Sequence, residues 1–568
     1  MSDARTRPRP SGASVIVAIT LVVAALALCL FVGWPYAMTR NLHVDEFHDI
    51  YGMRLLTTYA RPADADPVEI YLVVFGWVIR NATATADMVL TLRGMFFFIF
   101  VAALAGVAAA QRGMTALVER LGLLLLFLLF VPAWRHGIEI RHDILLGLGV
   151  TFLYAIAETS LSRPLGWKLA GSAGACAALM QLNSHKAVVL AAPALAAIVY
   201  LTMRHRALRP RIVLHTCAFV VAGGVAGLAL GALIFLRENA LHAYVDKLLH
   251  FADYASAAKR FSAAPVLWYM LQHGPVQCAL SIIGLVHAGL QWRTRGYHSA
   301  MIGAFFLVVV VVTLLINPTP FPYNMTWLSI GILISAAHGF RALTSWTARI
   351  RVSAMVTGGV VLALAVGTGM HAWQDDTYLH IPAKKQLDVI AAAEALTSAT
   401  DSVLDASGMV ASRPPASKDW ILHSLFMPEY KAGRREQFRD IIARDAPPVV
   451  IRNYYRWKWL TAADHDAVDA HYVALSPQLW VLGRHSETSA VTFDVIRRGR
   501  YLVLATTGHG VRVGGLDHPA RTIVTWDVGP QEIVADVGGI SITWLGPTLQ
   551  TSPVVADAAP LFWGVRFK

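Results

Sequence analysis

The sequence predicts a polytopic α-helical membrane protein with a C-terminal exported region that is first α/β and then β-rich. The chain has 568 residues, of which 56% are hydrophobic and only 15% are charged. Its mean hydropathy of +0.52 is too high for a soluble protein of this size. Lys and Arg occur in short clusters between long apolar segments. The net charge of +12 therefore indicates membrane topology rather than nucleic-acid binding.

Eleven apolar segments are predicted to be membrane spans. If the N-terminus is cytoplasmic, the inner loops hold basic clusters such as Arg204, Arg206 and Arg209. The positive-inside rule then places the first loop, and everything after Met370, on the outer side. The predicted spans are residues 14–37, 91–111, 121–134, 144–162, 169–183, 187–203, 212–236, 275–291, 299–316, 323–340 and 352–371.

The chain divides into a predicted membrane domain, residues 1–371, and two predicted exported subdomains. In residues 372–485, helical pattern alternates with short β runs such as PPVVIRNYY, which predicts an α/β unit. In residues 486–568, runs such as VTFDVI and RTIVTWDV are separated by Gly, Pro and Asp, which predicts an antiparallel β-sandwich. The cysteines all lie in predicted spans, so the exported region cannot depend on disulfides. They are Cys29, Cys176, Cys217 and Cys278.

Three hairpin tips bring charged side chains to the predicted outer face. The first loop holds His-Val-Asp-Glu at residues 43–46, followed by PVEIYLVVFGWVIR, which is too short to cross and predicts a juxtamembrane helix. The third span ends in PAWRHGIEIRHD, and Lys186 lies in the short turn between the fifth and sixth spans. We expect these tips to share one cavity. Residues 237–274 are interpreted either as a flap over that cavity or as an amphipathic surface helix.

Carboxylates facing cations at a membrane surface suit glycosyl transfer from a lipid phosphate, which needs a base and a cationic phosphate site. Asp45 is the candidate base, and Glu46 is expected to orient the acceptor or share the proton. A helix N-cap is the alternative for Asp45 and for Asp143, the third catalytic candidate. The candidates for binding the donor phosphate, each of which could instead be a snorkelling cation, are Lys186, Arg93, Arg141 and Arg237.

The sequence predicts no definite cofactor, and a bound divalent metal ion stays an open alternative. His43, His48 and His142 lie on the same predicted side as the carboxylates and are weak metal-ligand candidates. Their spacing is not diagnostic of a metal site. The sequence contains no G-x-x-x-x-G-K-[ST] loop and no G-x-G-x-x-G fingerprint, so no nucleotide-binding motif points to a nucleotide cofactor.

Four pieces of the chain together resemble the GT-C class of multi-spanning glycosyltransferases, especially the aminoarabinose transferase and protein O-mannosyltransferase branch. The pieces are HVDEFHDIYGMRLL, PVEIYLVVFGWVIR with LTLRGMFFF, EIRHDILLG and NSHKAVVL, and the likeness covers about residues 14 to 345. It supports Asp45 with Glu46, Arg93, Arg141 with Asp143, and Lys186. Two pieces depart from the family: Asp66-Pro67-Val68 lacks the usual cation or imidazole, and FPYNM keeps Tyr323 without an Arg.

The resemblance implies a GT-C fold with about eleven transmembrane helices and juxtamembrane helices in the first periplasmic loop. It further implies a polyprenyl-phosphate-linked sugar as donor, drawn from the lipid bilayer, and a periplasmic acceptor that is a lipid, an envelope glycan or a protein. Transfer would invert the anomeric carbon. The protein would lie in the bacterial inner membrane, with its N-terminus cytoplasmic and its C-terminal domain periplasmic.

Two alternatives to an enzyme remain open at this point. A lipid or glycan transporter or flippase with a periplasmic glycan-binding tail would place ionisable residues within spans and often show an inverted repeat. Neither feature is evident in the sequence. A membrane anchor with a carbohydrate-binding or sensing tail would leave all function in the isolated tail.

Overall fold

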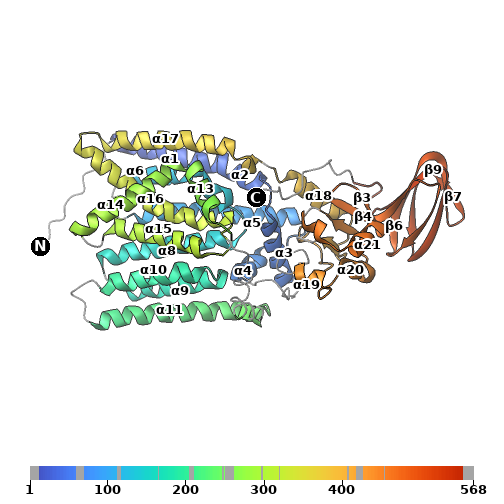
Figure 1. Ribbon diagram of the computed structural model, residues 1–568, viewed down its shortest axis with the longest axis horizontal. Coiled ribbons are helices and arrows are strands. Elements are labelled where there is room, and N and C mark those ends of the chain that lie inside the picture. The colour runs from blue at the N-terminus through green and yellow to red at the C-terminus, as the bar shows by residue number, and fades with distance from the viewer. Residues whose placement is uncertain are drawn as a thin grey trace.

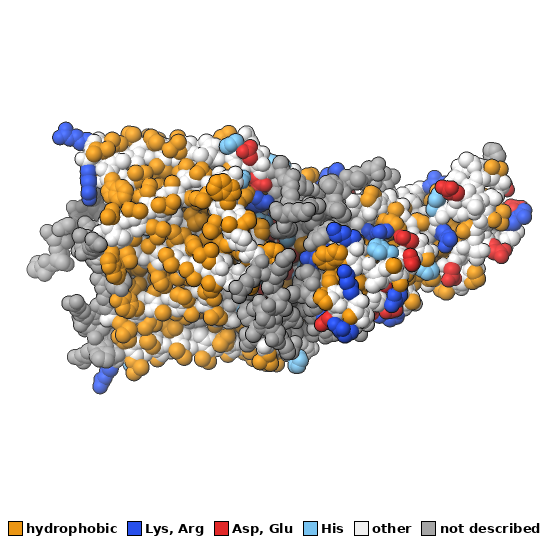
Figure 2. All heavy atoms as spheres, viewed as in Figure 1, with side chains coloured by type: hydrophobic (Ala, Val, Ile, Leu, Met, Phe, Trp, Pro, Cys, Tyr) orange, Lys and Arg blue, Asp and Glu red, His pale blue; other side chains and the backbone are white. Residues whose placement is uncertain are grey.

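The computed structural model describes most of the chain. The described residues are 12–58, 69–111, 117–163, 165–203, 210–242, 244–245, 249, 261–295, 298–318, 320–380, 382–405, 408–417, 427–452 and 455–553. A long helical bundle forms one end of the molecule and a strand-rich region forms the other (Figure 1). Hydrophobic side chains cover the visible face of the bundle, whereas charged side chains gather over the strand-rich end (Figure 2).

Every predicted span falls on helical structure, although residues 14–37 contain three consecutive helices and residues 121–134 cross the break between two. Six of the described helices are long and apolar enough to cross a membrane, or seven if the α6–α7 pair counts as one span bent by 66°. The chain is therefore a multi-pass membrane protein. The number of eleven membrane crossings stays a prediction. The bundle contains α1 (Gly12–Ala27), η1 (Leu28–Gly33), α2 (Trp34–Thr39), α5 (Thr85–Ala110), α6 (Leu117–Leu128), α7 (Val131–Gly137), α8 (His142–Ser162), α9 (Trp167–Asn183), α10 (Ala187–Met203), α11 (Pro210–Arg237), α13 (Ala264–His273), α14 (Pro275–Arg295), α15 (Ser299–Ile316), η2 (Pro322–Asn324), α16 (Met325–Arg349) and α17 (Ala354–Asp375).

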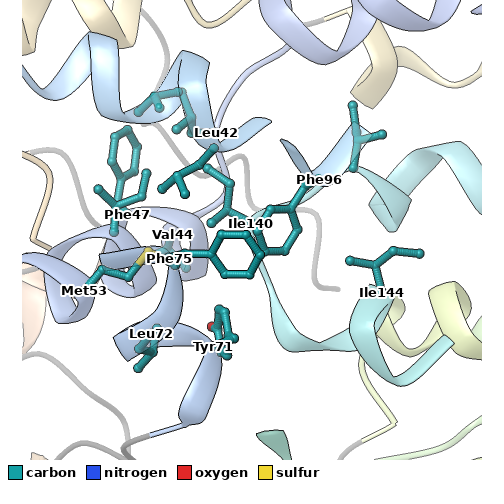
Figure 3. Close-up of a cluster of buried hydrophobic side chains, with 14 of the residues drawn as sticks. Leu42, Val44, Phe47, Met53, Tyr71, Leu72, Phe75, Phe96, Ile140 and Ile144 are labelled. Carbon is teal, nitrogen blue, oxygen red and sulfur yellow. The ribbon is translucent and has the colours of Figure 1, made fainter. Parts of the chain in front are cut away.

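Two short helices fill the first loop, between the bundle and the strand-rich region (Figure 1). They are α3 (Val44–Thr58), which we call the acid helix, and α4 (Ile70–Ile79), which matches the predicted juxtamembrane helix. The two cross closely at Gly76, where an added Cβ would lie 2.6 Å from Thr57 Cγ2. Phe47 of α3 and Phe75 of α4 belong to one buried apolar cluster with Phe96 of α5 (Figure 3). The acid helix is thus fixed by packing on the bundle.

The predicted flap is described only in part. Its C-terminal portion forms α13, whose last residue, His273, is separated from α14 by Gly274 alone. Residues 243, 246–248 and 250–260 lie outside the described part of the chain.

The C-terminal part that was predicted to be exported, which we call the exported region, combines short helices with a nine-stranded sheet of order β1-β2-β4-β9-β6-β7, to which β3, β5 and β8 attach. Among the described strand pairs, β1 and β2 are parallel and the others are antiparallel. The elements are η3 (Thr377–His380), α18 (Lys384–Ala395), β1 (Val403–Asp405), α19 (Met427–Lys431), α20 (Phe438–Asp445), β2 (Val449–Ile451), η4 (Tyr455–Trp459), α21 (Ala462–His471), β3 (Tyr472–Ala474), β4 (Leu479–Ser486), β5 (Ala490–Val495), β6 (Gly499–Val513), β7 (Leu516–Pro519), β8 (Arg521–Trp526) and β9 (Gly529–Trp544).

The change from the α/β part to the antiparallel part takes place within one strand. The first half of β4 pairs with β2 and β3, and its second half, from Gly483, pairs with β9. An added Cβ at Gly483 would lie 2.1 Å from the Ile542 carbonyl oxygen, so the close approach of these strands requires glycine. The strand-rich C-terminal region is as predicted. Hydrogen bonds nevertheless join its strands to those of the α/β part in one sheet, and the subdomain boundary at residues 485/486 stays a prediction.

A buried group of ionic side chains anchors the acid helix to the bundle. The Arg93 guanidinium of α5 donates to both carboxylate oxygens of Glu46, over 3.1 and 2.9 Å. Arg40 lies 3.5 Å from Glu46 and 3.3 Å from Glu139. The side chains of Arg40, Glu46 and Arg93 are 0% exposed. Two carboxylates therefore face two guanidinium groups in a site without solvent, which is the arrangement that a buried charge requires.

We call the buried group of Arg40, Glu46, Arg93 and Glu139 the anchor. Removing one of its charges should cause a large loss of stability. Glu46→Gln leaves the Arg93 guanidinium buried beside a neutral amide, and we expect the free energy of unfolding to fall by about 3–5 kcal/mol. SDS titration in mixed micelles would measure it. The control is Asp517→Asn, which breaks the ion pair of Asp517 with Arg512 on the exposed surface of the sheet and should leave stability unchanged. Equal stability of the two variants would contradict the anchor.

Candidate functional site

Asp45 and Glu46 occupy the first turn of the acid helix but point in different directions. Successive residues of an α-helix are rotated by about 100°, so the packing that turns Glu46 inward leaves Asp45 partly open. The Asp45 side chain is 29% exposed and contacts Arg141 from the α7–α8 turn. The expected role of Glu46 in orienting the acceptor or sharing a proton does not fit this geometry, because Glu46 is enclosed by the anchor.

Arg141 connects the two candidate catalytic carboxylates. Its Nη1 donates to Asp45, and its Nε donates to Asp143 Oδ2 over 3.2 Å. The guanidinium carbon lies 3.7 Å from the centre of the Tyr323 ring, which stabilises the cation by a cation–π contact. Arg141 is the N-cap residue of α8 and Asp143 lies in the first turn. The negative charge of Asp143 therefore lies at the positive end of the helix dipole.

The third hairpin tip contributes Lys186, which lies between α9 and α10. Its Nζ donates to Asn324 Oδ1 over 3.1 Å and lies 3.8 Å from Asp143 Oδ1. It also lies 5.0 Å from the centre of the Tyr323 ring. The structure therefore brings Asp45, Arg141, Asp143 and Lys186 together as one chain of contacts, which we call the charge cluster. The expected convergence of the three tips at one face is confirmed.

Two of the predicted phosphate ligands lie elsewhere. Arg93 is fully buried, and its guanidinium is engaged by Glu46 and by the carbonyl oxygens of Arg40 and Asn41. Arg237 lies at the end of α11, where it is 67% exposed, 3.7 Å from Glu238 and 4.9 Å from the ring centre of Trp77. A phosphate could reach Arg93 only by breaking the anchor, so its position indicates a structural role.

The three histidines that were candidates for a metal site have separate partners. His43 lies 3.6 Å from Asp45, His48 lies 3.6 Å from Asp49, and His142 lies 2.9 Å from Glu69. Among the residues that the structure describes, no group of three or more His, Cys, Asp or Glu side chains has the arrangement of a metal site. The donor set therefore offers no fit for a divalent ion at the described positions.

Sequence reasoning did not assign a role to Asn324. It appeared only within the FPYNM piece that departs from the family, yet its amide oxygen accepts a hydrogen bond from Lys186, and its side chain is buried. The available signal was its place in the turn just before α16, directly after Tyr323. This turn supplies both the ring beside Arg141 and the acceptor atom beside Lys186.

The protonation states of Asp45 and Lys186 depend on burial and on the neighbouring charges. Burial raises the pKa of the Asp45 carboxyl, but Arg141, assisted by His43 and His48, outweighs it and lowers the pKa to about 2. Burial lowers the pKa of the Lys186 amine, an effect that the nearby Asp143 carboxylate opposes. At neutral pH, Asp45 is thus an ionised acceptor.

Comparisons with known proteins find similar solved structures but no match by sequence. No family model and no curated protein sequence matches the chain. The crystal structure of ArnT from Cupriavidus metallidurans, bound to undecaprenyl phosphate, aligns with a TM-score of 0.56 and 11% identity, over 83% of this chain and 98% of ArnT. The oligosaccharyltransferase AglB from Archaeoglobus fulgidus, in complex with an inhibitory peptide and a dolichol-phosphate, aligns with a TM-score of 0.47 and 11% identity, over 91% of this chain and 76% of AglB.

The alignment with ArnT extends over nearly all of that protein and over both the bundle and part of the exported region of this chain. At 11% identity, the shared feature is the arrangement of the elements and not the side chains. ArnT is a GT-C glycosyltransferase. The predicted fold is confirmed: this multi-pass chain has the GT-C fold.

Proposed function

We propose that the protein is a membrane glycosyltransferase that moves a sugar from a polyprenyl-phosphate carrier to an acceptor at the outer membrane face. The observation that carries the proposal is the charge cluster. Three chain segments that are distant in sequence place Asp45, Arg141, Asp143 and Lys186 in contact, where the acid helix meets the bundle. The GT-C fold, and the binding of undecaprenyl phosphate by ArnT, agree with this function.

Lys186 and Arg141 form the proposed site for the donor phosphate. Both cations lie against the Tyr323 ring, at 5.0 and 3.7 Å from its centre, and so they face one small region. Arg141 offers a planar pair of donors and Lys186 a point charge, which together suit the two non-bridging oxygens of a phosphodiester. Burial disfavours the charged form of Lys186, and an arriving anion would relieve that cost.

Asp45 is the proposed general base, and Arg141 controls its strength. While Arg141 contacts Asp45, the pKa of that carboxyl is about 2, and the carboxylate is a weak proton acceptor. A donor phosphate that draws the guanidinium toward itself weakens this contact. The pKa of Asp45 then rises, so the base becomes effective only when the donor is bound.

The proposed reaction is a single displacement at the anomeric carbon. Asp45 takes the proton of the acceptor hydroxyl, the hydroxyl oxygen bonds to the anomeric carbon, and the bond from that carbon to the phosphate oxygen breaks. The electron pair leaves with the polyprenyl phosphate, whose added negative charge Lys186 and Arg141 stabilise. One displacement inverts the configuration of the sugar. Asp143 orients Arg141 and Lys186 by accepting from both.

The described part of the chain has one feature that a transporter would show, an ionisable side chain inside the bundle, but this side chain has a structural explanation. His338 is buried in the middle of α16, where its Nε2 lies 3.0 Å from the Tyr154 hydroxyl of α8. This pair was not foreseen, since no ionisable residue within a span was evident in the sequence. It joins two neighbouring helices of the bundle, as polar pairs in membranes commonly do. The pair therefore has a packing role that requires no transport pathway.

Replacing the proposed base tests the function directly. Asp45→Asn removes the proton acceptor but keeps the size of the side chain, and we expect the rate of sugar transfer to fall by about 10²- to 10⁴-fold. The assay would use purified protein, a polyprenyl-phosphate sugar and an envelope extract as acceptor source, with binding of polyprenyl phosphate as a check on folding. Asp388→Asn on the exposed face of α18 is the control. Transfer by Asp45→Asn at the wild-type rate would refute the proposal.

The pairing of Asp45 with Arg141 predicts a shift in the pH dependence. Because Arg141 lowers the pKa of Asp45, its replacement by glutamine should raise that pKa by about 1–3 units. The base is then protonated at a higher pH, so the acid limb of the kcat/KM profile should move upward by the same amount. Lys186→Gln is the matched control: it weakens phosphate binding without contacting Asp45. If the acid limb of the kcat/KM profile lies at the same pH in both variants, the assigned role of Arg141 is contradicted.

A further inference from the structure

The first α-helix of the exported region, α18, contacts the segment that leads into the acid helix and the start of α5. We propose that α18 positions the candidate active site: Gln386 fixes the backbone that leads into the acid helix, and Glu394 fixes the N-terminus of α5. The consequence for catalysis rests on the function proposed above, whereas the contact itself does not.

Gln386 makes two hydrogen bonds to one residue of the bundle domain. Its Oε1 accepts from the Leu42 N–H over 2.6 Å, and its Nε2 donates to the Leu42 carbonyl oxygen over 3.0 Å. Both residues are buried, Gln386 at 4% and Leu42 at 0% exposure. Close by, the Ala383 N–H donates to the Thr39 carbonyl oxygen over 2.7 Å. The side chain thus replaces the partner strand that an extended backbone would otherwise need.

Leu42 lies in the short connection that leads directly to the acidic pair. Residues 41–43 belong to no helix or strand and connect α2 with the acid helix. His43, the next residue, donates its N–H to Glu46 Oε2 over 2.8 Å, and Asp45 comes two residues later. Since the buried polar groups of Leu42 have their partner on α18, the entry angle of the acid helix depends on that contact. The direction of Asp45 therefore depends on it too.

Glu394 binds the N-terminus of α5, the helix that carries Arg93 of the anchor. Its Oε1 accepts from the Thr85 N–H over 2.8 Å, at the first residue of α5. The N-cap residue of that helix, Ala84, offers no side-chain cap, so the carboxylate of α18 supplies both the missing acceptor and a negative charge at the positive end of the helix. Arg93 lies eight residues further along α5, about two turns. Ser412 strengthens the contact by donating to Glu394 and to Thr85 Oγ1.

The two contacts belong to one face of α18, because residues 386 and 394 are eight positions apart, close to two helical turns. One rigid helix thus holds both the segment that leads into the acid helix, which carries Glu46, and the start of α5, which carries Arg93. A third contact lies beyond α18, where Gly408, at φ +68°, packs on the acid helix so closely that an added Cβ would lie 2.7 Å from Tyr51 Cβ. The exported region is therefore part of the support of the site and not a detachable tail.

Gln386→Leu in the full-length protein tests the proposal, because leucine keeps the bulk and removes both hydrogen bonds. The matched control is Gln437→Leu. Gln437 is also buried in the exported region and donates to the carbonyl oxygens of Tyr430 and Arg435 over 3.0 and 2.7 Å, but it does not contact the bundle domain. The first measurement is hydrogen exchange of the backbone amides of residues 40–46, and the second is the pH profile of sugar transfer.

We expect amide exchange at residues 40–46 to become at least tenfold faster in Gln386→Leu and to stay at the wild-type rate in Gln437→Leu. We also expect a higher pH for the acid limb in Gln386→Leu alone, because a looser acid helix weakens the contact between Asp45 and Arg141. Unchanged exchange, or equal changes in both variants, would overturn the positioning role. If the wild type transfers no sugar, the proposed function fails, while the exchange result still decides whether α18 fixes this backbone.

Discussion

The buried ion pair of Glu46 with Arg93 is the interaction on which the candidate site depends. It joins residues 47 positions apart and holds the first turn of the acid helix against α5. Burying these charges carries a desolvation cost that only complete pairing offsets, so the pair tolerates one arrangement of the two elements. In that arrangement Glu46 faces the bundle. The neighbouring carboxylate of Asp45, rotated by about 100°, must face the α7–α8 turn. The direction of Asp45, the proposed base, is thus set by Glu46, which takes no part in the proposed reaction.

The sequence predicted the helices well and the side-chain partners poorly, for identifiable reasons. Apolar runs located the long helices of the bundle, since the bilayer imposes a length and a composition on whatever crosses it. The alternation of inner and outer loops then placed Asp45, Asp143 and Lys186 on one face, and Arg141 with them. Composition could not tell which of two adjacent acids turns inward, because that depends on a rotation that tertiary packing decides. Arg93 was therefore assigned to a phosphate when its partner is Glu46.

The contact of Gln386 with Leu42 lay beyond sequence reasoning for another reason. The two residues are 344 positions apart, and the atoms that Gln386 binds belong to the backbone, which every residue shares. No pattern of side chains at residue 42 could signal such a contact. Several strands of the exported region, among them β2, β5 and β8, were predicted from alternation and turn residues, but their union into one sheet through β4 was not. A strand that changes partners at a glycine leaves no mark in periodicity.

Charge balance links the structure of the cluster to the proposed chemistry. Two carboxylates and two cations leave the empty cluster neutral. A bound phosphodiester brings one negative charge, and its departure as a monoester creates a second. The proton that Asp45 accepts from the acceptor hydroxyl removes one negative charge from the cluster at the same moment. The net charge of the site therefore stays constant through the displacement, and little reorganisation of the surrounding dipoles is needed. This balance requires Asp45 to be ionised before the reaction and adjacent to the phosphate cations. Its contact with Arg141 provides both conditions.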